Sequence, residues 1–304
     1  KSIATGSVLH TIGYPLKNKA YGGSFLYKLS DNLASVGFVV GLDYKNPYLS
    51  PYQEFQQYKS HKFIKNMLSR GKRISYGARA LNEGGFQSLP KFTFPGGMLI
   101  GCEAGTLNVL KIKGTHTAMK TGMLAAKSFY ENYVNNDPQI ELVKFNNDFK
   151  NSSVYKELYK CRNVRPGFKK GLIGGLINTF LDQKILSGKA PWTLRHSHKD
   201  NEVLNKKENS KNIIYPKHDN IITFDRLTNL SFSGTNHKED QPCHLKIQDK
   251  SIPIDINLKF FNSPETRYCP AGVYEIVEQK NNINDKCTSQ SVLQINFQNC
   301  LHCK

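Results

Sequence analysis

Three cysteines near the C-terminus constrain this chain more than any other feature. Cys300 and Cys303 form a Cys-x2-Cys pair, and Cys269, which Pro270 follows, lies 31 residues before the pair. Iron–sulfur clusters are held in this way, by closely spaced thiolates together with a distant Cys-Pro. The spacing therefore predicts a ligand site built from both segments.

Two other interpretations of the same residues remain open. A tetrahedral zinc ion binds three thiolates and one imidazole, and His302, His237 or His244 could supply the imidazole. The cysteines could also be unrelated buried thiols. Spacing alone does not decide between the cluster, the zinc ion and chance.

The ends of the chain suggest a piece of a longer protein. It begins with Lys1 and stops inside the cysteine run, so a further ligand of a C-x2-C-x2-C series is expected just after Lys304. The first residues lack a charged stretch followed by an apolar one, so nothing there is typical of a signal peptide. Seven cysteines, mostly scattered, favour a reducing compartment over a disulfide framework.

The chain is strongly basic, with a net charge of +18 from 42 Lys and Arg against 24 Asp and Glu. Such a charge suits nucleic acid, an anionic membrane surface or an acidic protein partner. Much of the excess lies in Asp200–Lys217 and Glu278–Ser291, which are expected to be loops. The charge is therefore equally compatible with an ordinary solvated surface, and basic and aromatic residues do not interleave along any one strand as nucleic acid binding would favour.

The first residues predict a β-sheet. Ser7–Ile12, Ser24–Leu29 and Ser35–Leu42 are rich in β-branched and aromatic residues and are bounded by Gly, Asn or Asp. Between the first two strands, Gly22 and Gly23 would let a flat ligand or another backbone approach closely, although a glycine pair also suits a plain turn.

A helix is predicted over Tyr52–Leu68, with Ser50 as its N-cap and Pro51 as its first residue. Two further strands are expected after it, over Arg73–Arg79 and Phe94–Gly101.

The stretch Leu99–Thr115 leads into a predicted helix over His116–Tyr133 that contains small residues. Free N–H groups and the positive end of the helix dipole at Gly114 and Thr115 would stabilise negative charge on a reduced flavin. A helix packed on a sheet through its small residues explains the same pattern. The chain contains no G-x-G-x-x-G, so the main dinucleotide fingerprint is absent from it.

The apolar run Gly171–Leu181 is too short to cross a bilayer. Lysines flank it and Trp192 follows it, as expected of a helix lying on an anionic lipid surface. An ordinary buried helix fits the same residues.

After the Asp200–Lys217 linker, a small α+β unit is expected to carry the terminal cysteines. It includes a short strand over His244–Gln248 and the segment Ile254–Phe261.

Eight runs, in order along the whole chain, resemble one family, the electron transfer flavoprotein–ubiquinone oxidoreductases. These runs are Tyr21–Tyr27, Gly41–Pro51, Tyr76–Ser88, Lys111–Lys120, Ala190–His196, Ser233–His237, Arg267–Glu275 and Gln298–Cys303. The chain is similar to the C-terminal half of that family.

The resemblance implies an enzyme, an electron-transferring-flavoprotein dehydrogenase, with FAD, one 4Fe–4S cluster and a ubiquinone site. It would take electrons from its partner, reduced electron transfer flavoprotein, and pass them to ubiquinone. It would bind the lipid surface of the mitochondrial inner membrane from the matrix side, as a monotopic protein, and would bind no nucleic acid. These 304 residues alone are expected to be inactive.

The resemblance also implies site residues. Cys269, Cys300 and Cys303 match three cluster ligands, and the fourth would follow Lys304; Cys287 matches none. Tyr274 matches a tyrosine beside the cluster, where a hydroxyl bonded to cluster sulfur would raise the potential.

Gly22 and Gly23 match glycines whose backbone meets the quinone head group, and Asn108, Gly114 and Thr115 match the part that contacts FAD. Leu110 stands where the family has Pro. The membrane helix would be Gly171–Leu186, and because Asp182, Gln183 and Lys184 lie within it, shallow binding is expected.

The implied fold is a mixture of α+β and α/β: part of a FAD-binding domain with an inserted quinone-binding β-sheet domain, plus a C-terminal ferredoxin-like 4Fe–4S domain. Residues 1–145 would hold the ubiquinone-binding sheet and the remainder of the FAD domain. Residues 146–215 would form the helical membrane-surface segment and linker, and 216–304 the truncated iron–sulfur domain.

Two other functions remain as alternatives. One is a basic zinc-binding module that grips nucleic acid. The other is a related flavoprotein dehydrogenase with a different electron donor.

Overall fold

The computed structural model describes residues 4–16, 20–30, 32–135, 140–283 and 286–303, without the side chains of 280–283 and 286–288. It contains two compact units, one made of Lys1–Arg79 with His198–Lys304 and the other of Ala80–Ser197. These limits differ from the predicted boundaries near residues 145 and 215, because the first unit joins both ends of the chain. The division into functional domains over residues 1–145, 146–215 and 216–304 stays a prediction.

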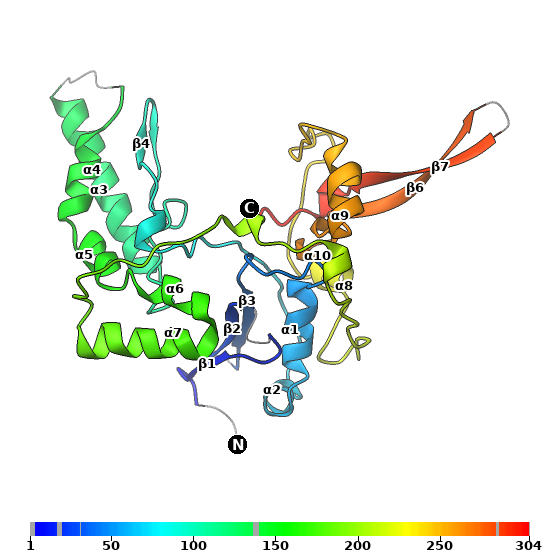
Figure 1. The fold of residues 1–304 in the computed structure, drawn as a ribbon, viewed down its shortest axis with the longest axis horizontal. Coiled ribbons are helices and arrows are strands. Elements are labelled where there is room, and N and C mark those ends of the chain that lie inside the picture. Colours follow the sequence, from blue (N-terminus) through cyan, green and yellow to red (C-terminus); the bar gives the residue numbers. More distant parts are fainter. Residues whose placement is uncertain (1–3, 17–19, 31, 136–139, 284–285, 304) are drawn as a thin grey trace. The chain divides into compact units, whose positions relative to one another are not determined.

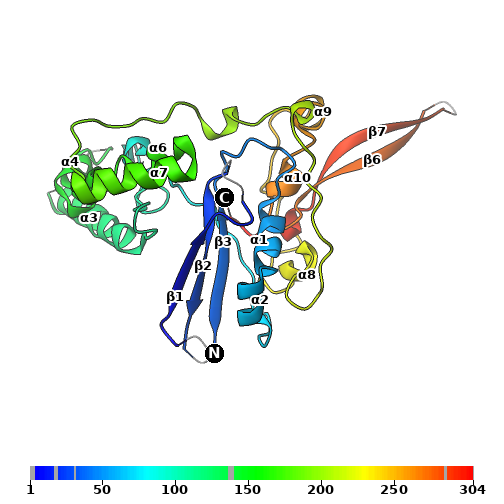
Figure 2. The same ribbon diagram turned by 60° about the horizontal axis from the view of Figure 1, so that its bottom comes forward.

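The first unit contains the predicted N-terminal sheet, which is confirmed. Strands β1 (Val8–Ile12), β2 (Gly22–Lys28) and β3 (Ala34–Val40) pair antiparallel in the order β1-β2-β3 (Figure 2). Because neighbouring residues of a strand point to opposite faces, the register gives each face its own side chains. The inner face, with Leu26 and Phe38, packs on α1 (Pro51–Lys59), where the rings of Phe38 and Tyr58 lie 5.4 Å apart.

The helix predicted over Tyr52–Leu68 forms two helices, α1 and α2 (Lys62–Leu68). Ser50 is the N-cap as predicted, since its hydroxyl accepts a hydrogen bond from the Gln53 N–H at 3.4 Å. The chain breaks at His61, whose ψ of 130° is extended, so the helix cannot continue through it.

The C-terminal part of this unit holds short helices and one long hairpin (Figure 1). The helices are α8 (Arg226–Leu230), α9 (Lys259–Phe261), which follows a π-helical turn over Ile252–Leu258, and α10 (Glu265–Tyr268). The hairpin pairs β6 (Tyr274–Ile283) with β7 (Lys286–Ile295). Single 3-10 turns lie at Asp200–Glu202, Lys207–Asn209 and Phe297–Asn299.

Two sequence predictions were wrong here. His244–Gln248 is irregular, although it was expected to be a strand, whereas Ile254–Phe261, expected only as part of the α+β unit, is helical. Glu278–Ser291 was expected to be a loop, yet it belongs to the β6–β7 hairpin. Cross-strand backbone hydrogen bonds form with any side chain, so an Asn-rich sequence still pairs when its neighbours, such as Val277 and Val292, favour strands.

The second unit is mainly helical and contains α3 (Thr115–Val134), α4 (Lys144–Asn151), α5 (Ser153–Lys160), α6 (Val164–Gly167) and α7 (Gly171–Phe180). A π-helical turn, Leu181–Ile185, extends α7, and 3-10 turns lie at Phe86–Ser88 and Phe168–Lys170. Of the predicted strands Arg73–Arg79 and Phe94–Gly101, only the small hairpin of β4 (Thr93–Phe94) and β5 (Gly97–Met98) is present among the described residues.

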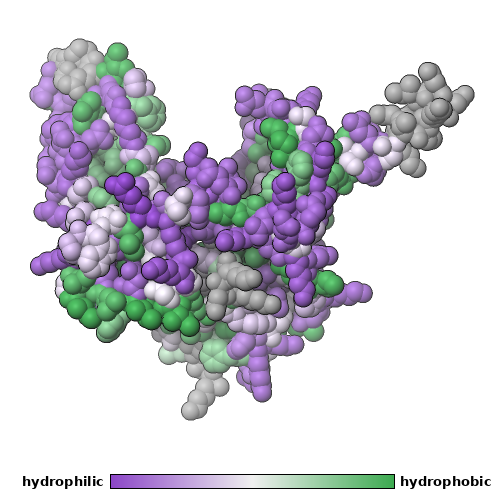
Figure 3. Space-filling model, viewed as in Figure 1, coloured by the Kyte–Doolittle hydropathy of each residue, from purple (hydrophilic) through white to green (hydrophobic). Residues whose placement is uncertain are grey.

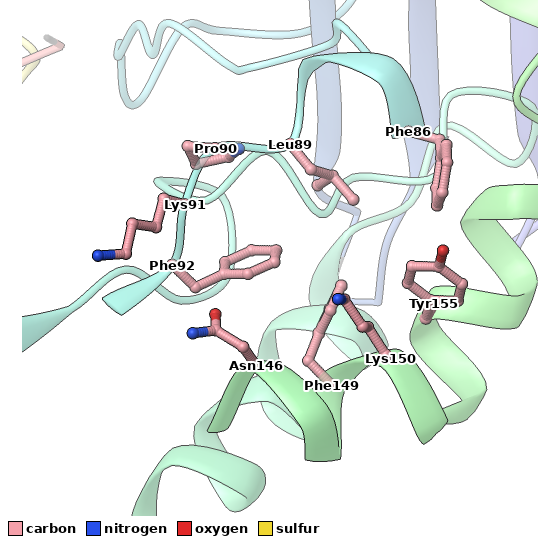
Figure 4. Close-up of a pocket in the computed structure, with 9 residues that line it drawn as sticks. All are labelled: Phe86, Leu89, Pro90, Lys91, Phe92, Asn146, Phe149, Lys150 and Tyr155. Carbon is pink, nitrogen blue, oxygen red and sulfur yellow. The ribbon is translucent and has the colours of Figure 1, made fainter. Parts of the chain in front are cut away.

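Aromatic side chains from three segments form the core of this unit. Phe92, Phe145 and Phe149 are buried together with Ala104, Val154 and Leu158, and the rings of Phe92 and Phe149 lie 4.4 Å apart. A cavity of about 360 Å³ opens beside this core between the β4 segment, α4 and α5 (Figure 4). Lys91, Lys150 and Asn146 line it among aromatic and aliphatic side chains, and it contains none of the predicted site residues.

Helix α3 packs on its own unit through polar residues. Thr117, Thr121 and Ser128 are buried, whereas Met119 and Tyr130 are each 66% exposed. The burial of the threonines is tolerated because their hydroxyls are hydrogen-bonded; that of Thr121 accepts from the Gly101 N–H at 3.1 Å and donates within the helix. The predicted close packing through small residues holds at Ala118, which lies against Gly101, and at Ala125, which packs against the aromatic core, whereas Ala126 is exposed.

Candidate cluster and cofactor sites

The three predicted cluster ligands lie together in the first unit. Cys269 ends α10, and Cys300 follows the last 3-10 turn. Pairing of Tyr274 with Ile295 at the base of the hairpin returns the chain to its starting point, and the Asn296 N–H donates to the Val273 carbonyl at 2.7 Å. The hairpin therefore closes the gap of 31 residues between the two cysteine segments.

Backbone N–H groups point at two of the sulfur atoms. The Val273 N–H donates to Sγ of Cys269, and the His302 N–H donates to Sγ of Cys300, each at 3.4 Å. Such bonds stabilise negative charge on sulfur, and hydrogen bonds to sulfur are one of the features that set the potential of a cluster. These residues thus fit a group that needs anionic thiolates.

Packing and charge link the three cysteines. Cys300 packs against the buried cluster that contains Cys269. Burial raises the pKa of Cys303, and the neighbouring Cys269 and Cys300 raise it further. The same three cysteines, after burial, raise the pKa of Tyr274. A cationic metal centre would offset the repulsion between thiolates at such a site.

Three histidines lie beside Cys300. The ring centroids of His237, His244 and His302 are 4.8 to 5.7 Å apart, and His237 Nε2 lies 2.8 Å from the Cys300 carbonyl oxygen. Ligand atoms of His244, Cys300 and His302 all lie within 4.8 Å of one another, so these three residues could hold a single ion. Geometry alone therefore leaves the zinc interpretation possible.

Three residues that sequence reasoning did not assign support the cysteine segments. The Tyr76 hydroxyl donates to the Pro270 carbonyl at 2.8 Å, and Arg79 Nη1 donates to the His302 carbonyl at 3.1 Å. Arg226 Nη1 donates to the carbonyls of Thr266 and Cys269, both at 2.8 Å. Tyr76 and Arg79 lie in Tyr76–Ser88, one of the runs that resemble the family, and this resemblance could have pointed to them. Nothing in the sequence around Arg226 pointed to it.

Gly22 and Gly23 lie at the start of β2, not in a turn. A Cβ on Gly22 would be 2.1 Å from the Val39 carbonyl oxygen, and one on Gly23 would be 2.4 Å from that of Thr11. Close backbone packing therefore requires both glycines. Gly23 also belongs to the outer face of the sheet, beside Ile12, which is 58% exposed.

Asn108 and Gly114 lie in one loop of the second unit, and Thr115 begins α3 directly after it. Asn108 is buried and bridges to Lys113 across the loop, and its amide donates to Glu157 Oε1 at 2.6 Å. Gly114 is the N-cap of α3 and provides no side-chain cap, so the first N–H groups of the helix have no capping side chain there.

Glu157, which the sequence analysis missed, anchors this loop. Its Oε1 accepts from Lys111 Nζ at 3.1 Å and lies 2.9 Å from His116 Nε2, in addition to the bond from Asn108. These hydrogen bonds lower the pKa of Glu157 although partial burial opposes them. Leu110, at the tip of the loop, is 40% exposed.

Helix α7 and the turn after it expose one apolar side (Figure 3). Its exposed residues are Ile173, Leu176, Ile177, Phe180, Leu181 and Ile185. Asp182 turns inward instead, where the Asn163 amide donates to it at 3.1 Å, and the Gln183 amide donates to the Lys160 carbonyl at 2.8 Å. Shallow binding was expected because Asp182, Gln183 and Lys184 lie in this segment. Since Asp182 and Gln183 bond to the protein itself, they do not interrupt the exposed apolar side.

No helix in the described part of the chain is long and apolar enough to cross a membrane. The side chain of Cys287, which was predicted not to be a ligand, lies outside the described ones.

Two family models match the chain. One, described as "ETF-QO, ubiquinone-binding", matches residues 1–81, and the other, described as "Electron transfer flavoprotein-ubiquinone oxidoreductase, 4Fe-4S", matches residues 220–304. Gly22 and Gly23 fall within the first match, and all three cysteines of the proposed cluster fall within the second.

The chain is also similar to full-length proteins named electron transfer flavoprotein-ubiquinone oxidoreductase, mitochondrial. The protein from Sus scrofa is 51% identical over 308 residues, which are 98% of this chain and 49% of that protein. The Homo sapiens protein is 50% identical over 100% of this chain and 50% of its own length, and the Caenorhabditis elegans protein is 51% identical over 98% and 51%. The chain thus spans about half the length of these relatives. It belongs to the electron transfer flavoprotein–ubiquinone oxidoreductase family and corresponds to the C-terminal half of its members.

Proposed function

We propose that the protein to which this chain belongs transfers electrons from reduced electron transfer flavoprotein to ubiquinone, through FAD and a 4Fe–4S cluster. The observation that carries the proposal is the meeting of Cys269, Cys300 and Cys303, within the part that matches the 4Fe–4S family model. A flavin and a cluster supply one-electron chemistry, which a chain of one-electron carriers feeding a two-electron acceptor needs.

In this proposal the three cysteines hold three corners of the cluster. Thiolate donors and N–H groups aimed at sulfur suit either metal centre, and the match of residues 220–304 to a 4Fe–4S family model favours iron–sulfur over zinc here. Tyr274 stands beside the cysteines, where its hydroxyl would bond to cluster sulfur. The comparisons lend no support to a zinc module that binds nucleic acid.

Ubiquinone is proposed to bind the outer face of the N-terminal sheet. Gly23 places no side chain on this face beside the exposed Ile12, and the ring of Phe25, which lies over Gly37, adds apolar surface. A flat head group could lie against such a surface, with its hydrocarbon tail on the exposed apolar residues.

FAD is proposed to bind beside the Asn108–Thr115 loop, where the N-terminus of α3 would stabilise negative charge on the reduced flavin. The rest of the FAD-binding domain would come from the half of the relatives that this chain does not match.

The membrane contact is proposed to be α7, on the matrix side of the mitochondrial inner membrane. Its apolar side is exposed, and Lys169, Lys170, Lys184 and Lys189 flank it, as anionic lipid would favour.

The test is the composition of the full-length protein purified without oxygen. Visible absorption and electron paramagnetic resonance (EPR) should show one flavin and one cluster, and elemental content about four irons per chain with little zinc. Stoichiometric zinc without iron and flavin would overturn the proposal. Assays with different flavoprotein donors then decide between electron transfer flavoprotein and another donor.

A separate variant tests the quinone site. Ile12→Asn changes an exposed side chain next to Gly23 and spares the glycine backbone. We expect a higher KM for ubiquinone with unchanged flavin and cluster spectra. An unchanged KM would argue against the outer face as the quinone site.

A further inference from the structure

Two arginines from distant parts of the sequence reach the backbone of the cysteine segments. Arg79 Nη1 donates to the carbonyl of His302, which lies between Cys300 and Cys303, at 3.1 Å. Arg226 Nη1 donates to the carbonyl of Cys269 itself, at 2.8 Å. Each ligand segment therefore has a fixed positive charge beside it.

Local packing holds Arg226 in place. It is the first residue of α8, and its second hydrogen bond, to the Thr266 carbonyl at 2.8 Å, spans the turn before Cys269. A Cβ on Gly272 would lie 3.5 Å from its Nε, so the guanidinium packs over the bare turn that follows Cys269 and Pro270. Guanidinium keeps its charge at any physiological pH, so this charge is permanent.

Arg79 reaches the other cysteine segment in the same way. The carbonyl that it contacts belongs to His302, whose next residue is Cys303. Both arginines thus place positive charge beside the backbone of the cysteine segments.

Reduction adds one electron to a cluster that is already anionic, so a nearby fixed cation stabilises the reduced form more than the oxidised form. Net charge, hydrogen bonds and solvent exposure set the reduction potential of such clusters. We propose that Arg79 and Arg226 raise the reduction potential of the cluster, as positioning residues that act through charge. The inference rests on the proposed cluster.

The experiment measures the midpoint potential of the cluster by EPR-monitored redox titration of the full-length holoprotein. Arg79→Gln removes the charge and Arg79→Lys keeps it, and Arg226→Gln and Arg226→Lys form a second pair. We expect each Gln variant to reduce the equilibrium constant for reduction about tenfold, which is about 59 mV for one electron. Each Lys variant should retain most of the wild-type potential.

Arg70→Gln is the matched control, because Arg70 is exposed just after α2. Its potential should equal that of the wild type. Equal potentials for the Gln variants and this control would overturn the inference. So would Lys variants whose potential falls as far as that of the Gln variants, since the effect would then depend on hydrogen-bond geometry and not on charge.

Cluster assembly gives a second readout. If the Gln variants lose the cluster and the Lys variants keep it, the requirement for positive charge is supported; if both kinds lose it, the inference is wrong and the arginines only hold the fold. A wild-type protein without a cluster signal would instead contradict the proposed function. Failure of the inference about the arginines can therefore be distinguished from failure of the proposed function.

Discussion

Asn296 donates its backbone N–H to the carbonyl of Val273 at 2.7 Å, and this bond seals the base of the β6–β7 hairpin. Val273 in turn donates to Sγ of Cys269 at 3.4 Å, and the Asn299 amide donates to the Gly272 carbonyl at 3.3 Å. The hairpin, whatever its length, therefore returns the chain to the same point. The base of the hairpin therefore fixes where the two cysteine segments meet.

Cysteine replacement tests the ligand set. Cys300→Ser or Cys303→Ser in the full-length protein should abolish the EPR signal of the cluster, since a hydroxyl is a far poorer iron ligand than a thiolate. Cys243→Ser is the matched control, because Cys243 is a partly buried thiol that donates to the Leu245 carbonyl. Cys287→Ser should also keep the signal. A cluster that survives loss of Cys300 would refute the assignment.

Gly23→Ala tests the packing of the sheet. The new methyl group would lie 2.4 Å from the Thr11 carbonyl oxygen, so strands β1 and β2 must separate. We expect a loss of about 1–3 kcal/mol in the free energy of unfolding, measured by denaturant titration. Gly77→Ala, where a Cβ meets nothing within 4 Å, should change it little. Equal effects of the two would contradict the packing argument.

Lys59 makes the stability depend on pH. Burial, and then the charge of Arg73, lower its pKa from 10.5 to about 8, against the opposing effect of Asp219. Between these values the folded state binds fewer protons than the unfolded state, so the free energy of unfolding rises with pH across this window. The penalty is present in full below about pH 8 and is on the order of 3 kcal/mol.

Lys59→Met removes this dependence. Denaturant titrations at about pH 7 and about pH 10 should show the wild type gaining stability relative to the variant at the higher pH. The exposed Lys62→Met provides the control, with a profile parallel to the wild type. Parallel profiles for Lys59→Met would show that the pKa of Lys59 is not lowered.

Glu157→Gln tests the loop proposed to contact FAD. It weakens the ion pairs with Lys111 and His116, and the Asn108 bond loses its charged acceptor. A loss on the order of 1–2 kcal/mol would lower FAD affinity roughly 5- to 30-fold, measured as flavin absorbance retained after dilution of the full-length protein. Glu131→Gln, which removes an exposed partner of Lys144, should retain flavin as the wild type does.

The exposed side of α7 can be tested with vesicles. Ile177→Glu places a charge among apolar side chains, and Ile177 is 56% exposed. We expect the full-length variant to sediment less with vesicles that contain anionic lipid. Gln183→Glu adds the same charge away from the exposed apolar side and should have a smaller effect. Equal loss in both variants would mean that net charge, and not this surface, governs binding.

The N-terminal strands, helix α3 and the Ser50 cap were predictable because they depend on neighbouring residues. Alternation of apolar side chains, a capping hydroxyl and a run of helix-forming residues act within a few positions. The strand expected at His244–Gln248 failed for the opposite reason. A short segment there takes the conformation that its packing in the first unit allows.

The family and the ligand candidates could be predicted from the residues alone, because Cys269, Cys300 and Cys303 carry their chemistry in their identity and spacing. The surroundings of these cysteines could not be predicted, because the fold sets them. Arg79 and Arg226 reach the cysteine segments across 223 and 43 residues, and nothing in their local sequence marks them as neighbours. Electrostatic influence depends on distance in space, which folding sets and residue spacing does not record.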